Sequence, residues 1–115
     1  SEAALKRAAT FGDGWHSTRI TPEEFKALTD KLKSFGLPPN FVISSRCAML
    51  DDRNEAPNAR GANFSMGGDA QSIVDDIRRF EDCGCSYMTM TMWNGDLPAF
   101  FARMRRFAEE VVPKF

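Results

Sequence analysis

Two hydrophobic periodicities divide this chain into strands and helices. Residues 86–93, SYMTMTMW, alternate methionine with threonine, and a period of two is that of a β-strand whose two faces differ. Residues 41–50, FVISSRCAML, are apolar at both ends and small in the middle, which predicts a second strand. A short extended stretch from Trp15 to Ser17 predicts a third strand.

Four helices are predicted beside these strands, because apolar residues recur at helical spacing. The first covers residues 1–11, and the others follow Thr21, Asp69 and Asp96. Thr21 and Glu24 also have the spacing of a capping box. The residues expected to end the helices are Gly12, Gly36, Gly84 and Pro113. The wide apolar face of the last helix is expected to contain Leu97, Phe100, Phe101, Met104, Phe107, Ala108 and Val111.

The order of these elements predicts parallel βα units. Strands alternate with helices as α-β-α-β-α-β-α, with a long loop at residues 51–67. The methionines suit a strand face that meets helices, whereas Thr89 and Thr91 suit the crowded, partly polar interior of a barrel. An open doubly wound sheet would bury both strand faces and show longer apolar runs. The pattern therefore favours an α/β fold that is a partial (β/α)8 TIM barrel of three βα units.

Three strands are fewer than the eight that close such a barrel. Alone, they would leave two unpaired sheet edges and an uncovered interior face. We expect residues 1–115 to form a single domain that pairs with itself, pairs with another chain, or belongs to a longer barrel. A ferredoxin-like α+β dimer is a further option, but no Asn-Gly or Asp-Gly turn joins two strands as its hairpins would require.

The composition argues against nucleic acid, a membrane or a metal ion as a binding partner. The 115 residues carry 15 basic and 16 acidic side chains, so there is no basic excess to indicate nucleic-acid binding. No apolar run approaches the roughly 20 residues that span a bilayer, and the opening SEAALKRAAT does not resemble a signal peptide. Three cysteines then favour reduced thiols and a cytoplasmic location. Cys83-Gly84-Cys85 and one histidine do not complete a zinc site, so no metal is expected.

Three segments together resemble the luciferase-like monooxygenases, which are flavin- or deazaflavin-dependent (β/α)8 oxidoreductases. Residues 1–16, SEAALKRAATFGDGWH, resemble the family's helix that closes with Ala/Gly-Asp-Gly-Trp. Residues 68–90 resemble its helix beginning Gly-Ser/Thr-Pro-Glu and the last barrel strand, and residues 106–113 resemble its terminal helix. The segments span nearly the whole chain, in the family's order.

The resemblance implies the carboxyl-terminal portion of such a barrel, from the helix after the fifth strand to the final helix. The family's first five strands and the Gly-Gly turn before Ser1 are absent from this sequence. Asp69 and Ala70 replace the usual Ser/Thr-Pro, although Asp69 can still cap a helix. The implied cofactor is flavin mononucleotide or a deazaflavin, or none in this fragment, and the implied substrate is a small molecule. We expect the chain to be inactive alone.

Candidate site residues come from the carboxyl ends of the strands, where barrel active sites lie. Trp15 and His16 end the first strand, Arg46 lies near the end of the second, and Trp93 and Asn94 follow the third. We expect these five residues to surround one mouth, which by resemblance holds the flavin or deazaflavin ring and the substrate.

Two of these residues are the catalytic candidates. His16 would exchange a proton near neutral pH, and Arg46 would hold a phosphate or another anionic group. Trp15 or Trp93 would stack on the ring, although Trp15 also suits a core position. The cofactor-binding candidates are Ser1, Trp15, Trp93 and Asn94.

Two hypotheses follow. In the first, the chain is a truncated flavin- or deazaflavin-dependent oxidoreductase, a monooxygenase or a hydride-transfer enzyme. In the second, it is an α/β binding or structural module without redox activity that forms a homo-oligomer through its exposed strand edges. The two are distinguished by whether the candidate residues converge on an open pocket or lie in an interface.

Overall fold

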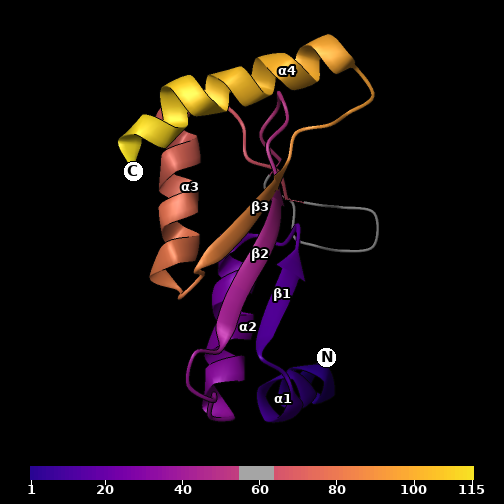
Figure 1. Cartoon of the computed structure of the whole chain (residues 1–115), viewed down its shortest axis with the longest axis vertical. Helices are drawn as coiled ribbons and strands as arrows, with labels where there is room; N and C mark the ends of the chain where they lie inside the picture. The colour runs from indigo at the N-terminus through magenta and orange to yellow at the C-terminus, as the bar shows by residue number, and fades with distance from the viewer. Residues whose placement is uncertain (55–63) are drawn as a thin grey trace.

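A parallel three-stranded sheet forms the centre of the molecule (Figure 1). The structure is a computed structural model that describes residues 1–54 and 64–115, so the middle of the expected 51–67 loop lies outside the described residues. The strands are β1 (Gly14–Thr18), β2 (Val42–Ala48) and β3 (Tyr87–Thr91), in the spatial order β1-β2-β3. Both pairings are parallel, so the predicted fold class, a TIM-barrel-like fragment of βα units, is confirmed.

Helices precede and follow every strand, as predicted. They are α1 (Glu2–Phe11), α2 (Pro22–Ser34), α3 (Ala70–Asp82) and α4 (Leu97–Arg106), and α4 continues through a π-helical turn (Phe107–Val111) and a 3-10 turn (Val112–Lys114). None of these helices, in the part of the chain that the structure describes, could span a bilayer.

The predicted caps are confirmed at three helices. Thr21 and Glu24 form the reciprocal capping box of α2, with both hydrogen bonds at 3.1 Å. Asp69 and Asp96 accept hydrogen bonds from the first turns of α3 and α4. Gly12 differs from expectation, because it is extended rather than left-handed. Its lack of a Cβ still matters, since a Cβ there would lie 2.8 Å from the Ala8 carbonyl oxygen.

One face of the sheet packs against helices, and this is the methionine face. Met88 and Met90 contact the buried core, and Trp15 stacks on Phe25 of α2 with ring centroids 5.9 Å apart. The alternate residues of the strands form the other face, which we call the open face. Its exposed members are Gly14, His16, Thr18, Val42, Arg46 and Tyr87. The half-buried Thr89 and Thr91 share this face, as their alternation with methionine predicts.

The chain beyond β2 contributes to the core, which the sequence did not predict. Phe64 and Met66 are 1% and 0% exposed, although they belong to a segment expected to be a loop. The Met66 amide donates to the Ala48 carbonyl at 2.7 Å, and Met66 bridges Met49 in parallel. This short segment therefore closes the carboxyl end of β2 with apolar side chains.

A buried carboxylate attaches the same loop to α3. Asp76 is 2% exposed and accepts two hydrogen bonds from the Arg53 guanidinium, the second at 3.0 Å. Arg79, one turn along α3, lies 3.7 Å from Asp76 and also pairs with Glu23 of α2. A carboxylate without these partners would be costly at this depth, so the cluster fixes the loop and two helices together.

We expect Asp76→Asn to lower the free energy of unfolding by about 2 kcal/mol, because the substitution leaves Arg53 without its bidentate partner. The loss is smaller than for a fully buried pair, since 27% of the Arg53 side chain is exposed. Urea denaturation measures the change. The neighbouring exposed Asp75→Asn is the matched control and should change stability by less than about 0.5 kcal/mol. Equal effects of the two variants would contradict this role for Asp76.

Candidate functional site

The open face places a histidine and a serine in direct contact. His16 Nδ1 lies 2.9 Å from Ser44 Oγ, and Ser44 Oγ donates to the Trp15 carbonyl oxygen at 3.2 Å. Because a carbonyl only accepts, the hydroxyl proton points to Trp15, and Nδ1–H donates to Ser44. The neutral ring then keeps its lone pair on Nε2. His16 is exposed, so this nitrogen is able to accept a proton from a bound molecule.

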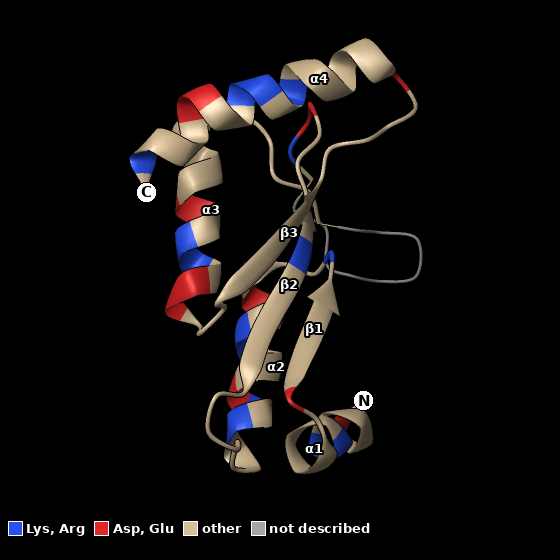
Figure 2. Ribbon diagram, in the orientation of Figure 1, with Lys and Arg blue, Asp and Glu red and all other residues tan. Residues whose placement is uncertain are grey.

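Arg46 is the charged residue of the sheet. It is the one basic band on β2 in Figure 2, and β1 and β3 carry no charged side chain. In the strand register Arg46 lies between Thr18 and Thr89, one pair of residues beyond the level of His16 and Ser44. Its guanidinium is exposed and makes no ion pair or hydrogen bond with the described residues. An exposed guanidinium whose neighbours in the register are two threonines suits an anionic group.

Arg19 adds an unsatisfied donor at the same end of the sheet. It follows β1 directly and has a left-handed backbone (φ 52°), which is uncommon for a residue with a side chain. Its amide donates to the Arg46 carbonyl oxygen at 2.7 Å, and its Nε is buried without a hydrogen-bond partner among the described residues. Strain and an unpaired donor are features that concentrate at binding sites. The sequence carries no local signal for this conformation.

Arg103 of α4 contacts the residues that follow the carboxyl end of β3. It is 5% exposed, and its Nε and Nη2 donate to Asp51 at 2.9 and 2.6 Å. Its Nη1 donates to the Met92 carbonyl at 3.0 Å and to Asn94 Oδ1 at 3.1 Å. The Arg103 guanidinium lowers the pKa of Asp51 below its usual value. Its place in the run of arginines on the last helix predicts a solvated side chain, and this expectation is wrong, because four acceptor atoms surround the Arg103 guanidinium.

The structure brings some predicted site residues together and separates others. His16 and Arg46 lie on the open face, two positions apart in the sheet register. Trp15 instead faces α2 and stacks on Phe25, which matches its alternative assignment to the core. Ser1 caps α1 at the opposite, amino end of β1 (Figure 1).

The remaining two candidates follow β3. Trp93 is 52% exposed and meets Phe100 edge to face, with ring centroids 5.7 Å apart. Asn94 is exposed, and its side-chain oxygen is already bonded to Arg103. The five residues expected at one mouth are therefore divided between the open face, the core and the end of α4. On the open face, the structure places His16 in contact with Ser44, and Arg46 two positions further along β2.

Two solved structures share this fold. Coenzyme F420-dependent tetrahydromethanopterin reductase from Methanopyrus kandleri matches with a TM-score of 0.70 and 15% identity, over 100% of this chain and 49% of that one. An F420-dependent secondary alcohol dehydrogenase in complex with an F420–acetone adduct matches with a TM-score of 0.63 and 13% identity, over 96% and 45%. The chain thus spans about half the length of each enzyme. At these identities the similarity establishes the fold.

Sequence comparison finds a protein with a different printed function from these two enzymes. A metal ABC transporter substrate-binding lipoprotein, FimA of Streptococcus parasanguinis, is 34% identical over 76 residues, which cover 66% of this chain and 23% of the lipoprotein. No family model matches the chain. In the residues that the structure describes, no group of three or more His, Cys, Asp or Glu side chains is placed to hold a metal ion.

The contact with Ser44 makes the His16 tautomer measurable. We expect neutral His16 to be protonated at Nδ1, and the Ser44→Ala variant to shift toward the Nε2-protonated form because its acceptor is lost. The 15N shifts of the ring report this without ambiguity, since the chain has one histidine. Ser86→Ala, on the neighbouring strand segment, should leave the tautomer unchanged. An Nε2-protonated ring in the unmodified protein would contradict this hydrogen-bond assignment.

The Asp51–Arg103 pair predicts a pH dependence of stability. Because the folded pKa of Asp51 lies below its usual 3.8, the stabilisation is complete above that value and is lost as pH falls through the lowered pKa. Unfolding measured from about pH 6 to 3 should therefore show a smaller acid loss of stability in Asp51→Asn than in the unmodified protein. Parallel pH profiles for the two proteins would rule out this contribution.

Proposed function

We propose that this chain provides three βα units of a luciferase-like (β/α)8 oxidoreductase that uses a deazaflavin. The observation that carries the proposal is the match of 100% and 96% of the chain to the folds of two F420-dependent enzymes. In this chain, one face of the sheet leaves His16 and Arg46 exposed. The sequence resemblance to luciferase-like enzymes runs through the same elements in the same order. The proposed reaction class is hydride transfer to or from a small molecule.

The residues of the open face suit the anionic and proton-exchanging parts of such a site. Arg46 has an unpaired guanidinium, and Arg19 Nε is a buried donor without a partner among the described residues. Both are donors that an anionic group of a cofactor would satisfy. The deazaflavin, when bound, supplies the hydride chemistry.

His16 has a separate role in this proposal. Its Nε2 lone pair points away from Ser44, so it accepts or returns a proton at the substrate oxygen while hydride moves. Ser44 and the Trp15 carbonyl fix the ring's tautomer. His16 is thus the proposed catalytic residue, and Ser44 is a positioning residue. Flavin mononucleotide is the second cofactor we propose to test, since the family resemblance includes both.

The test is a titration of the purified chain with F420 and, separately, with flavin mononucleotide, followed by quenching of cofactor fluorescence. We expect saturable F420 binding, and at least about tenfold weaker binding by Arg46→Ala, a loss typical of one charge-assisted contact. Arg105→Ala on α4 is the matched control, because Arg105 is also exposed and makes no contact that involves the open face. Failure of both cofactors to bind, or equal effects of the two variants, would contradict the proposal.

A second candidate function is an interaction module without redox chemistry. It is favoured by one observation, the sheet edges: β1 and β3 each pair with β2 on one side, and no other strand among the described residues covers their outer sides. Exposed edges are templates for pairing with another chain. An assembled protein that binds neither cofactor would favour this function over the oxidoreductase.

A further inference from the structure

Two loops meet just beyond the carboxyl ends of β2 and β3. In the sheet register Ala48, the last residue of β2, is level with Thr91, the last residue of β3. The Met49 amide donates to the Thr91 carbonyl oxygen at 2.9 Å, so the two strands stay paired to their ends. Asp51 follows soon after β2 and Trp93 soon after β3. Both residues therefore lie at the edge of the sheet where barrel enzymes bind their ligands.

The buried Arg103 side chain joins these two loops. Its guanidinium donates to both carboxylate oxygens of Asp51 in the loop after β2. It also donates to the Met92 carbonyl oxygen and to Asn94 Oδ1 in the segment after β3. Figure 1 shows α4, which carries Arg103, across the ends of these strands. A rigid, planar fork of donors suits such a junction, because it fixes the directions of several acceptors at once.

Trp93 stands between the two residues of this segment that Arg103 holds. Met92 is 7% exposed and is bound through its carbonyl oxygen, and Asn94 is bound through its side chain. Trp93 itself is 52% exposed. Its ring meets Phe100 of α4 edge to face, with an angle of 80° between the ring planes. The chain on both sides of the indole is thus held, while about half of Trp93 remains open to solvent.

The chain that follows Trp93 is also anchored. Gly95 has a φ of 96°, in the left-handed region that favours glycine, and so turns the chain toward α4. Asp96 then accepts a hydrogen bond from the Ala99 amide at 2.9 Å and caps the helix. An exposed aromatic ring on an anchored segment loses little conformational freedom when a ligand binds to it. This is the arrangement expected of a binding surface that is formed before the ligand arrives.

We propose that Arg103 is a positioning residue that holds Trp93 at the carboxyl edge of the sheet, where the indole stacks on the planar ring of a bound ligand. Stacked aromatic rings attract one another beyond the apolar area that they bury, and a ring fixed in advance keeps more of that gain. The inference rests on the proposed function for the identity of the ring, which is that of the deazaflavin. Fixation of Trp93 by Arg103 requires no ligand.

The decay of Trp93 fluorescence anisotropy tests the fixation. The chain has two tryptophans, so Trp15→Phe leaves Trp93 as the single emitter and keeps an aromatic ring against Phe25. In this background Arg103→Lys should add a fast component on the nanosecond timescale of loop motion, because an ammonium group cannot replace the guanidinium fork. Arg105→Lys, exposed on the same helix, is the matched control and should leave the decay unchanged.

Asn94→Ala is a milder variant for the same measurement. It removes one exposed acceptor and leaves the pair of Arg103 with Asp51 in place, so a smaller fast component is expected. Circular dichroism verifies the folding of each variant, and Asn94→Ala decides the question if Arg103→Lys does not fold. An unchanged decay in the folded variants, or an equal change in Arg105→Lys, would overturn the positioning role of Arg103.

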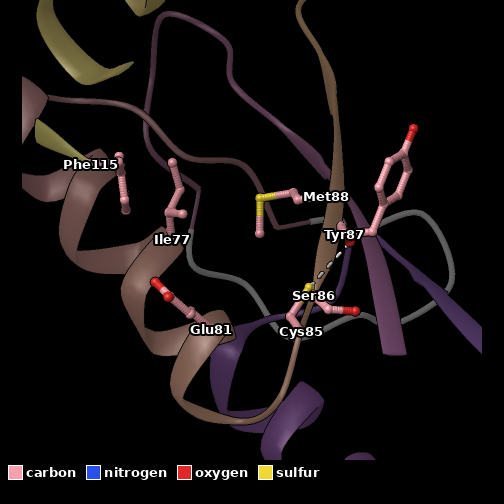
Figure 3. A pocket seen from close by; sticks show the side chains of 7 residues that line it. All are labelled: Ile77, Glu81, Cys85, Ser86, Tyr87, Met88 and Phe115. Atoms are coloured by element: carbon pink, nitrogen blue, oxygen red, sulfur yellow. Dashed lines mark hydrogen bonds between the residues drawn. The ribbon is translucent and has the colours of Figure 1, made fainter. Parts of the chain in front are cut away.

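Cofactor titration tests the stacking role. Trp93→Ala should weaken F420 binding at least about tenfold, and Trp93→Phe should stay within about threefold, since stacking needs an aromatic face. Phe115→Ala is the matched control, because Phe115 is 57% exposed and lines a cavity of about 280 Å³ between α3 and the start of β3, the other end of that strand (Figure 3). Arg103→Lys should weaken binding as well, whereas Asp76→Asn, which lowers stability elsewhere, should not.

The outcomes separate this inference from the proposed function. Equal F420 affinities of Trp93→Ala and Phe115→Ala would overturn the stacking role and leave the proposed function standing. If the unmodified chain binds neither F420 nor flavin mononucleotide, the proposed function and the stacking role are both contradicted. The anisotropy decay, measured without a cofactor, then still decides whether Arg103 fixes Trp93.

Discussion

Burial of one face of three parallel strands is the constraint on which the rest of the structure depends. Met88, Met90 and Trp15 turn toward the helices, and this places His16 and Arg46 on the opposite face. A shift of one residue in β2 would exchange the two faces of that strand and bury the Arg46 charge. The chemistry available to the protein is therefore a consequence of packing, because the side that the helices leave free is the side that can receive a ligand.

The sequence predicted the elements best where one local signal decides the outcome. The capping box at Thr21 and the Met/Thr alternation of β3 were read correctly, since both depend on neighbours a few residues away. Long-range contacts were not predicted in the same way. Arg103 looked like a solvated helix residue, but its acceptors come from Asp51, Met92 and Asn94, and only the fold brings them together.

The candidate site shows the same division. The sequence placed His16 and Arg46 at the carboxyl ends of their strands, but His16 is the third of the five residues of β1 and Arg46 the fifth of the seven residues of β2. The two side chains share a face of the sheet because of strand alternation, and not because the strands finish at one edge. Pairing of His16 with Ser44 depends on the register of β1 against β2, which composition does not encode. Arg19 was missed because its left-handed backbone is imposed by the turn into α2, whereas its residue type suggests no such conformation.

The last helix shows why the open edges matter to function. Only part of its apolar face is buried. Phe107 and Val111 pack against the core, whereas Leu97 and Phe101 are more than half exposed. The exposed apolar surface of α4 lies directly after β3 in the chain, and β3 has an unpaired outer edge. Further strands that extend the sheet would pair this edge and cover the apolar surface. The same extension would enclose His16 and Arg46, exclude water and strengthen their electrostatic interactions with a ligand. Extension of the sheet and enclosure of His16 and Arg46 would thus be the same structural event.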